Sequence, residues 1–395
     1  MTLLDILPSL RGTTTSRLDP TVWPPTTHYH HGRITVGGVD LDEVADRFGS
    51  PTYVLDDVGR RDAADAISRG FRGSEVLYST SSLLTGGVAR LVAGQHLSLV
   101  VHSQHELVFA RRNGVDPDRI VLVITSDESG SCSALMLEGG RVGRIVVDAG
   151  APIESLRSSA PDPQKTLVRV HDSRSADTVI RRVVDAPALE LIGVRCDAAP
   201  TPDDIRDQVL TAVAVMCDTY REHRMLTSQL QVGIVTGGTG HQGVAELGDA
   251  LENAVDEACI RNRFPRRRIA VDFGATVTAR AAVTVCRVCG VDRTRPGAPA
   301  VAVEDNGAGS AMAGVTAEPV SAAIANRHPL GPTDIFAITD SRDVTGGLLC
   351  SGVVLSQDIR AGDVIALVSR DGRDPLDSST VVSVAHGRAQ QLHAD

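Results

Sequence analysis

The feature that most constrains the fold is a regular alternation of short apolar runs with helix-like segments. Eight β-branched runs recur at 76–80, 97–101, 120–124, 145–148, 166–170, 190–195, 231–236 and 269–273. Helical patterns lie between several of them, including 104–113, 151–159, 174–184 and 202–225. Near-continuous apolar strands are typical of parallel sheets covered on both faces, and parallel connections need a helical crossover. Eight such units predict an α/β fold built on a (β/α)8 TIM-like barrel.

The helical period largely disappears after Phe273. Strand-like runs follow at 277–291, 300–304, 336–338, 348–355, 363–368 and 380–384, separated by Gly, Pro and Asp turns. This pattern predicts a mainly β carboxyl-terminal domain, which we expect the early strand around 34–36 to join. The predicted regions are a flexible amino-terminal segment (1–31), a strand and helix that pack with the β domain (32–57), the barrel (58–275) and the β domain (276–395).

The amino-terminal segment is rich in Thr and Pro and ends in the histidine run 28–31. Such a run can bind a metal ion, but at a proline-rich terminus it is interpreted as a solvated tail. The start of the chain lacks the basic and small-residue features of a signal peptide, and no run approaches the roughly 18 apolar residues of a membrane span. We therefore expect a cytoplasmic protein.

The charge of the chain excludes two classes of partner. The formal net charge is −10, with 42% apolar residues. Nucleic acids and anionic membranes need a basic surface, so neither is expected to bind. The seven cysteines suggest thiols in a reducing compartment. Cys286 and Cys289 form a C-x-x-C, but in a strand-like run whose alternate side chains face opposite sides, which favours separate thiols over a redox or zinc site.

Several motifs together carry a resemblance to a known family. They are Thr52–Asp56 (TYVLD) after a first strand and helix, the run ending at Tyr78, Ser103-x-x-Glu106-Leu107, and Gly143–Asp148 (GRIVVD). In this order, with a barrel and then a β domain, the chain resembles the fold-type III pyridoxal-phosphate decarboxylases of diaminopimelate, ornithine and arginine and the alanine-racemase-like barrels. The resemblance covers nearly the whole chain. It implies a two-domain fold, a homodimer and a cofactor site at the barrel mouth.

The residue that would hold the cofactor covalently is different here. The family reads Y-A-x-K-A-N where this chain reads Tyr78-Ser-Thr-Ser81-Ser-Leu, so Ser81 replaces the lysine. A hydroxyl cannot form that bond. Among 39 basic residues the one lysine is Lys165, which we expect just before a strand, at the barrel end opposite the mouth.

The other positions that the resemblance assigns to the cofactor also depart from the family. Asp197 matches a histidine that stacks on the cofactor ring, and Asp272–Ala275 (DFGA) matches E-P-G-R, without the phosphate-binding arginine. Asp272 could still pair with the ring nitrogen. A glycine-rich loop remains in part, and its backbone amides could cradle an anion at Gly237, Gly238 and Gly240.

The family's carboxyl-terminal motifs are weaker still. The C-x-x-x-D segment, which reaches into the partner subunit's site, matches only Cys350–Gly352, with no acid before Asp358. The tyrosine expected after the Gly-Asp-Val strand is missing from 369–372. These departures together predict a degenerate homologue without covalent pyridoxal phosphate, and no cofactor. It would form a homodimer and act as a binding, regulatory or scaffolding protein in amino-acid-derived metabolism, with an active paralogue as a further possible partner.

The ends of the barrel strands would form any remaining site. The candidate pocket residues are Ser81, His102, His105, His171, Asp197, Asp272 and Cys350, with Asp172 and His241 nearby in the pattern. Histidines and carboxylates suit a metal or acid–base site, so an enzyme with replaced chemistry is one alternative. The favoured interpretation is a polar, water-filled pocket left after the cofactor was lost, which a small-molecule ligand could enter. His102 and His105 are three apart at a strand-to-helix turn and need not both point inward, and no H-E-x-x-H spacing is present. Cys350 would need a base that sequence cannot place. Non-covalent binding of pyridoxal phosphate through the glycines and Asp272 is a third alternative.

Overall fold

The computed structural model describes most of the chain as two compact units. The described residues are 18–80, 86–94, 97–125, 141–156, 162–234, 241–274, 280–294, 299–304, 321–341, 347–369 and 380–392. One unit combines Met1–Asp62 with Thr276–Asp395, and the other is Ala63–Ala275. We refer to them as the β unit and the barrel unit.

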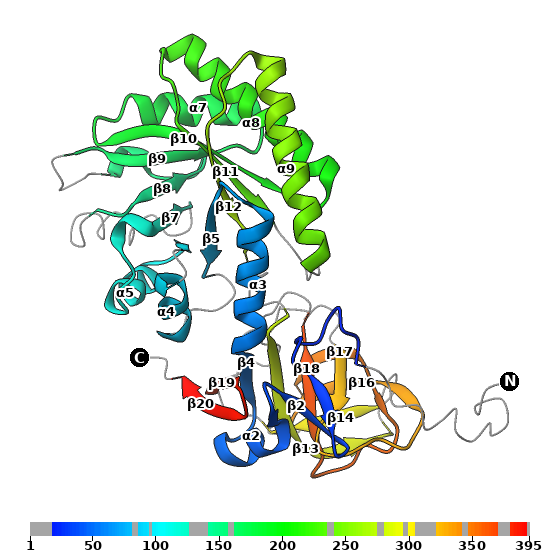
Figure 1. Ribbon diagram of the computed structural model, residues 1–395. Helices are drawn as coiled ribbons and strands as arrows, with labels where there is room; N and C mark the ends of the chain where they lie inside the picture. The colour runs from blue at the N-terminus through cyan, green and yellow to red at the C-terminus, as the bar shows by residue number, and fades with distance from the viewer. Residues whose placement is uncertain are drawn as a thin grey trace, which may run out of the picture. The chain divides into compact units, whose positions relative to one another are not determined.

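The barrel unit contains a closed barrel of parallel strands (Figure 1). Its strands are β5 (Glu75–Ser79), β6 (Ser98–Val101), β7 (Ile120–Ile124), β8 (Arg144–Val147), β9 (Gln164–Arg169), β10 (Leu189–Ala198), β11 (Gln229–Ile234) and β12 (Arg268–Asp272). Each pairs with the next in sequence, and β12 closes the ring by pairing with β5. All eight predicted strands are present, and the predicted barrel with a β domain is confirmed.

Helices connect the barrel strands, and several begin at the expected capping residues. They are α3 (Asp57–Gly70), α4 (Gly86–Gly94), α5 (Gln104–Arg112), α7 (Ser173–Val184), α8 (Pro202–His223) and α9 (His241–Asn262), with 3-10 turns η2 (Pro117–Arg119) and η4 (Ile153–Ser155). Ser103, Asp172 and Thr201 cap α5, α7 and α8 through side-chain oxygens. Within the described part of 151–159, the predicted helix is only the turn η4.

Apolar side chains fill the middle of the barrel. They are Leu77, Val100, Val121, Val123, Val146, Leu167 and Ala270. Alternate side chains of a strand share one face, so the residue two positions after a layer residue also points into the barrel, but nearer its mouth. The layer therefore supports whatever polar groups stand at the carboxyl ends of the strands.

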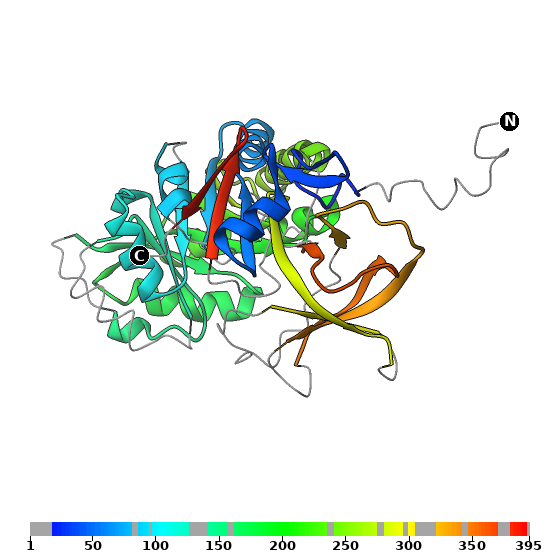
Figure 2. The same ribbon diagram turned by 90° about the horizontal axis from the view of Figure 1, so that it is seen from below.

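The β unit is built on two sheets. A small sheet contains β1 (His28–His30), β2 (Arg33–Val36) and β3 (Val39–Asp40), followed by α2 (Leu41–Phe48). The nine-stranded sheet contains β4 (Thr52–Asp56), β13 (Ala282–Asp292), β14 (Ala300–Val303), β15 (Ser321–Ile324), β16 (Thr333–Asp340), β17 (Leu348–Ser356), β18 (Val364–Val368), β19 (Thr380–Ala385) and β20 (Arg388–Leu392). Figure 2 shows β19 and β20 side by side in red.

The early strand around 34–36, expected to join the β domain, is β2, which lies in the β unit but in its small sheet. β4 is the early strand that pairs with β13 and β19 in the nine-stranded sheet. The expected flexible tail is ordered in its described part: Trp23 is 2% exposed, and its indole nitrogen donates to Ser321 Oγ at 3.1 Å. A large buried ring outweighs the local Thr/Pro composition. In the described ranges, no helix is long and apolar enough to cross a membrane.

Candidate active site

Four charged side chains from three barrel strands form one network at the carboxyl ends of the strands. They are Arg169 on β9, Arg195 and Asp197 on β10, and Asp272 on β12. Strand register explains their meeting: Arg169 pairs with Arg195, while Asp197, Gly233 and Asp272 stand at one level on β10, β11 and β12. The network therefore follows directly from how these strands pair.

Asp197 binds both arginines. Its Oδ2 accepts from Arg169 Nε at 2.6 Å, and its Oδ1 accepts from Arg195 Nε at 3.0 Å and Nη2 at 2.9 Å. Burial raises the pKa of Asp197, but the two guanidinium groups outweigh burial and hold it below its usual value. Asp197 is therefore ionised at neutral pH and anchors both arginine side chains.

The side chain of Arg195 passes over β11 and also binds Asp272 on β12. Its Nη2 lies 3.0 Å from Asp272 Oδ2, and a Cβ at Gly233 would lie 2.8 Å from the same nitrogen. The crossing thus requires glycine at 233. Burial lowers the pKa of Arg195, but Asp272 and Asp197 outweigh burial and raise it. Asp272 is 4% exposed, and its Oδ1 accepts from the Gly274 amide at 2.9 Å.

One nitrogen of this network has no partner among the described residues. Arg195 is 8% exposed, and its Nη1 is buried without a hydrogen-bond acceptor. Buried donors are nearly always paired in folded proteins, so this nitrogen can take an acceptor from water or from a ligand.

His102 lies at the end of β6, beside the network. Its Nε2 is 3.0 Å from Ser79 Oγ. Burial lowers the pKa of His102, and nearby Asp272 and Glu106 offset only part of this effect. The neutral imidazole is therefore favoured at neutral pH, where it can accept a proton. Glu106 fixes the backbone at this point, since it accepts from the His102 amide and from Thr80 Oγ1, both at 2.6 Å.

The other predicted histidines lie apart from this network. His105 is exposed in the first turn of α5. His171 is exposed because β9 ends at Arg169, and the chain then turns to Asp172, whose Oδ1 accepts from the Arg174 and Ser175 amides at 2.9 Å. The pocket predicted from seven positions is thus represented in the described barrel by His102, Asp197 and Asp272.

The predicted cysteine lies in the core of the β unit. Cys350 on β17 is 4% exposed among apolar neighbours, and burial raises the pKa of its thiol to about 11. The thiol form dominates at neutral pH, which disfavours a nucleophilic role. Cys286 is buried and Cys289 exposed on β13, as expected for residues on opposite faces of a strand.

Several predicted positions fall outside the described residues: Ser81 and the glycines Gly237, Gly238 and Gly240. His241 is the first residue of α9. Lys165 is exposed at the amino end of β9, four residues before Arg169, or roughly 13 Å along the strand. The sole lysine is thus at the barrel end opposite the network.

The sequence interpretation missed Arg169, Arg195, Ser79, Thr80 and Glu106. A usable signal was present, because Arg195 and Asp197 are two apart in one predicted strand and must share a face. The resemblance drew attention to positions where residues were replaced. It did not draw attention to charged residues that the family motifs leave unspecified.

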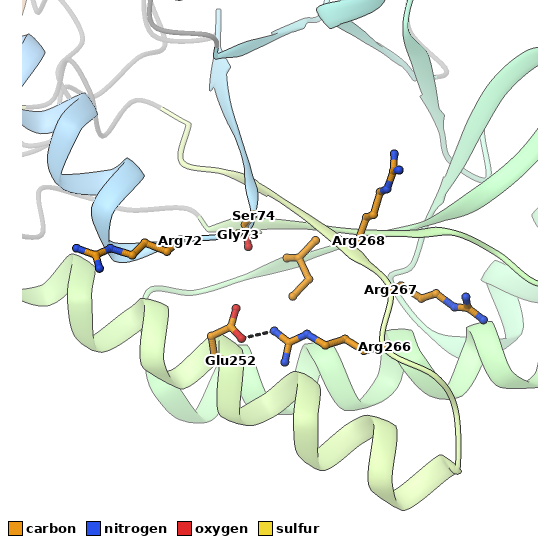
Figure 3. Close-up of a pocket in the computed structure, with 8 residues that line it drawn as sticks. Arg72, Gly73, Ser74, Glu252, Arg266, Arg267 and Arg268 are labelled. Carbon is orange, nitrogen blue, oxygen red and sulfur yellow. Dashed lines mark hydrogen bonds and ion pairs between the residues drawn. The ribbon is translucent and has the colours of Figure 1, made fainter.

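A hollow lies at the amino ends of β5 and β12, away from the network. It is lined by Arg72, Gly73, Ser74, Glu252, Arg266, Arg267, Arg268 and Ile269. Figure 3 shows its arginines directed away from one another, with Arg266 bound to Glu252. These side chains do not converge on a common point, so the hollow is a weaker candidate than the mouth.

Comparisons with known proteins identify decarboxylases. No family model matches the sequence. The chain is 29% identical over 403 residues to a diaminopimelate decarboxylase of Actinosynnema pretiosum subsp. auranticum, covering 93% of this chain and 89% of that protein. The structure of the diaminopimelate decarboxylase from M. jannaschii superposes with a TM-score of 0.75 at 14% identity, covering 93% and 94% of the two chains. The structure of SrLDC in complex with PLP and cadaverine gives 0.67 at 16% identity, covering 86% and 89%.

These findings contradict two predictions. The chain was expected to be a degenerate, non-catalytic homologue with no cofactor, but its relatives are named as decarboxylases and SrLDC was solved with PLP. The expectation treated each replaced motif residue as a lost function, although binding requires a set of charges and shapes that different residues can supply. The described residues fit the cofactor in part: buried Asp272 can accept from a ring nitrogen, and Arg195 Nη1 is a free donor.

Over most of its length this chain is thus similar in sequence to diaminopimelate decarboxylases, and it shares the fold of solved decarboxylase structures.

Proposed function

We propose that this protein is a pyridoxal-phosphate-dependent amino-acid decarboxylase of the diaminopimelate type that holds its cofactor without a covalent lysine. The observation that carries the proposal is the buried network of Arg169, Asp197, Arg195 and Asp272, with His102 beside it, at the carboxyl ends of the barrel strands. Active sites of such barrels lie at this end. The homology to diaminopimelate decarboxylases supports the reaction class.

The reaction replaces a carboxylate by hydrogen. An amino acid and one proton give the corresponding amine and CO2, so that diaminopimelate would give lysine. Pyridoxal phosphate, when bound, supplies an acceptor for the electron pair left on carbon as CO2 departs. The protein must bind and orient the cofactor and the amino acid, exclude water, and provide the proton.

The described residues can perform three of these tasks. Asp272 would hold the ring nitrogen, and Arg195 fixes the position of Asp272 through their 3.0 Å contact. His102 would pass a proton to or from the substrate, since its pKa is lowered and its Nε2 contacts Ser79 Oγ. Arg195 and Asp272 are 8% and 4% exposed, and this exclusion of water strengthens the interactions of their charges.

The absence of a covalent link is part of the proposal. Position 81 is serine, and Lys165 lies exposed at the other end of β9. The glycines Gly237, Gly238 and Gly240 would supply amides to the phosphate. The expected cytoplasmic location and homodimer also belong to the proposal, and light scattering of the purified protein tests the dimer.

The test combines binding, chemistry and turnover on the full-length protein. We expect saturable binding of pyridoxal phosphate by equilibrium dialysis, no mass increase after borohydride treatment, and release of CO2 from diaminopimelate when the cofactor is added. A borohydride-fixed adduct on Lys165 would contradict the lysine-free site. Absence of saturable binding would contradict the cofactor, and binding without CO2 release would contradict the decarboxylase assignment.

A further inference from the structure

We propose that Arg195 and Arg169 together form a binding site for an oxyanion group of the ligand, either a carboxylate or a phosphate. The proposal deepens the proposed function and rests on it only in placing the ligand at this end of the barrel. Neither the glycine loop nor the motif positions of the resemblance include these two arginines.

Arg195 has one donor nitrogen free among the described residues. Arg195 Nη1 is buried and has no acceptor in the described part of the chain, while Nε and Nη2 are both bound by carboxylates. A guanidinium cannot lose its proton to relieve this state. Its remaining nitrogen therefore needs an acceptor, and an oxyanion is the acceptor that a guanidinium binds most strongly.

Two guanidinium groups, those of Arg169 and Arg195, bind one carboxylate. Asp197 uses Oδ2 for Arg169 and Oδ1 for Arg195. Each arginine is thus held from one side, and their strands place them in register. The Arg169 side chain is 29% exposed, so part of it stays open to an incoming ligand. With Asp272 on Arg195 the four charges of the network balance, so the case for an oxyanion rests on the free nitrogen and on the open side of Arg169.

The side chains of Arg195 and Asp197 lie in fixed positions over the backbone at Gly233. A Cβ at Gly233 would lie 2.2 Å from Asp197 Oδ1 and 2.8 Å from Arg195 Nη2. Glycine at 233 therefore gives the space in which the carboxylate and the guanidinium lie over β11. Side chains already fixed by packing and ion pairs lose little entropy when they bind a ligand. The two arginines are held ready before any ligand arrives.

The primary experiment measures anion binding directly, without turnover. Calorimetric titration of the full-length protein with inorganic phosphate and with succinate should show saturable binding of at least one probe. Arg195→Met should weaken that binding at least tenfold, and the more exposed Arg169→Met should weaken it severalfold. Arg206→Met is the matched control, because Arg206 also pairs with a carboxylate, Glu257, but on the exposed surface of α8 and α9. It should leave binding unchanged.

A second variant keeps the test informative if Arg195→Met fails to fold. Gly233→Ala retains both arginines but fills the space that positions them, and it should also weaken anion binding at least tenfold. Circular dichroism establishes that each variant is folded. The proposal is overturned if wild type binds neither anion, or if folded Arg195→Met and Gly233→Ala bind both anions as tightly as wild type.

The source of the oxyanion is decided by matched ligands. If the site holds the cofactor phosphate, Arg195→Met should weaken pyridoxal phosphate but leave pyridoxal unchanged. If it holds a substrate carboxylate, the variant should weaken diaminopimelate more than cadaverine, which has no carboxylate. Weaker binding of either ligand by the variant supports the site. Unchanged binding of both ligands contradicts it. Because these titrations need no catalysis, an inactive protein that still binds anions through Arg195 would contradict only the proposed function.

Discussion

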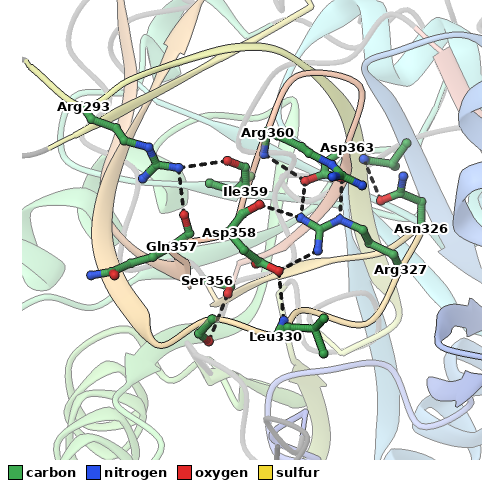
Figure 4. A network of polar contacts seen from close by, with 12 residues as sticks. Arg293, Asn326, Arg327, Leu330, Ser356, Gln357, Asp358, Ile359, Arg360 and Asp363 are labelled. Carbon is green, nitrogen blue, oxygen red and sulfur yellow. Dashed lines mark hydrogen bonds and ion pairs between the residues drawn. The ribbon is translucent and has the colours of Figure 1, made fainter. Parts of the chain in front are cut away.

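Arg195 in the barrel unit and Arg327 in the β unit are both held by two aspartates, yet they are bonded differently. Arg327 uses all three nitrogens: Nε donates to Asp363 Oδ1 and Nη1 to Asp358 Oδ2, each at 2.8 Å, and Nη2 donates to Asp363 Oδ2 at 2.7 Å and to the Asp358 carbonyl at 2.8 Å (Figure 4). Arg195 leaves Nη1 without an acceptor in the described residues. All three nitrogens of Arg327 are bound, although Asp358 Oδ1 is buried without a partner among the described residues. We call the Arg327 network closed and the Arg195 network open because of this difference between the two guanidinium groups.

The partners of the two arginines explain this difference. Around Arg327 the same carboxylates also bind backbone amides, Asp358 from Leu330 at 2.9 Å and Asp363 from Arg360 at 3.0 Å, so the network ties loops together. Burial raises the pKa of Asp358, but hydrogen bonds from Ser356, Arg327 and Leu330 outweigh burial and leave it at about 2. Around Arg195 the partners are strand-end side chains. A closed network stabilises the fold, whereas an open one can bind a ligand.

The largest expected effect comes from removing Arg327. Arg327→Met leaves Asp358 and the buried Asp363 without their cation, and breaking such a pair costs about 3–5 kcal/mol of unfolding free energy. Urea denaturation followed by circular dichroism measures this loss. A cost below 1 kcal/mol would show that the closed network does not stabilise the β unit, and the contrast with Arg195 would fail.

The next effect distinguishes the open network by its response to ligand. A ligand that binds only the folded state at 100 times its Kd raises the unfolding free energy by about 2.7 kcal/mol. We expect this gain for wild type with saturating phosphate or succinate, and little gain for Arg195→Met, because the free donor is lost. Thermal unfolding with and without the anion measures it. An equal gain in both proteins would place the anion elsewhere.

Much of the fold could be predicted from the sequence because its signals are periodic and local. The eight barrel strands are all recognisable as apolar runs, since each is buried on both faces. The amino-terminal strands were harder, because Trp23 is buried through contacts with residues nearly 300 positions away, such as Ser321. Composition alone described that segment as a tail.

Where each barrel strand ends decides which predicted residues reach the network. β10 extends to Ala198, so the side chain of Asp197 lies on the same face as that of Arg195 and binds it. His171 was expected at the mouth too, but β9 ends at Arg169 and the cap at Asp172 redirects the chain. Which strand ends first depends on capping and pairing, which a count of apolar residues does not reveal.

A smaller effect concerns the pH dependence of the open network. The lowered pKa of His102 means that the unfolded state binds more protons below the ordinary value of 6.5. Stability should therefore fall as pH decreases from 6.5 towards the folded-state pKa. His102→Gln should flatten this slope, by at most about 1.4 kcal/mol per pH unit. Asp197, whose pKa is lowered from 3.8, loses its contribution only at more acidic pH, so its window is separate. An unchanged slope from pH 5 to 7 in urea titrations would contradict the burial of a neutral imidazole.

The smallest effect tests whether burial, and not the number of partners, sets how much these networks contribute to the unfolding free energy. Arg181 also binds two carboxylates, Asp177 at 3.0 Å and Glu222 at 2.9 Å, but its side chain is 55% exposed. Exposed ion pairs contribute less than about 1 kcal/mol, because water and salt screen the charges. Arg181→Met should therefore lower the unfolding free energy only slightly, and 0.5 M salt should reduce even that difference. If its cost approached that of Arg327→Met, the number of carboxylate partners, and not burial, would set the contribution of such a network to the unfolding free energy.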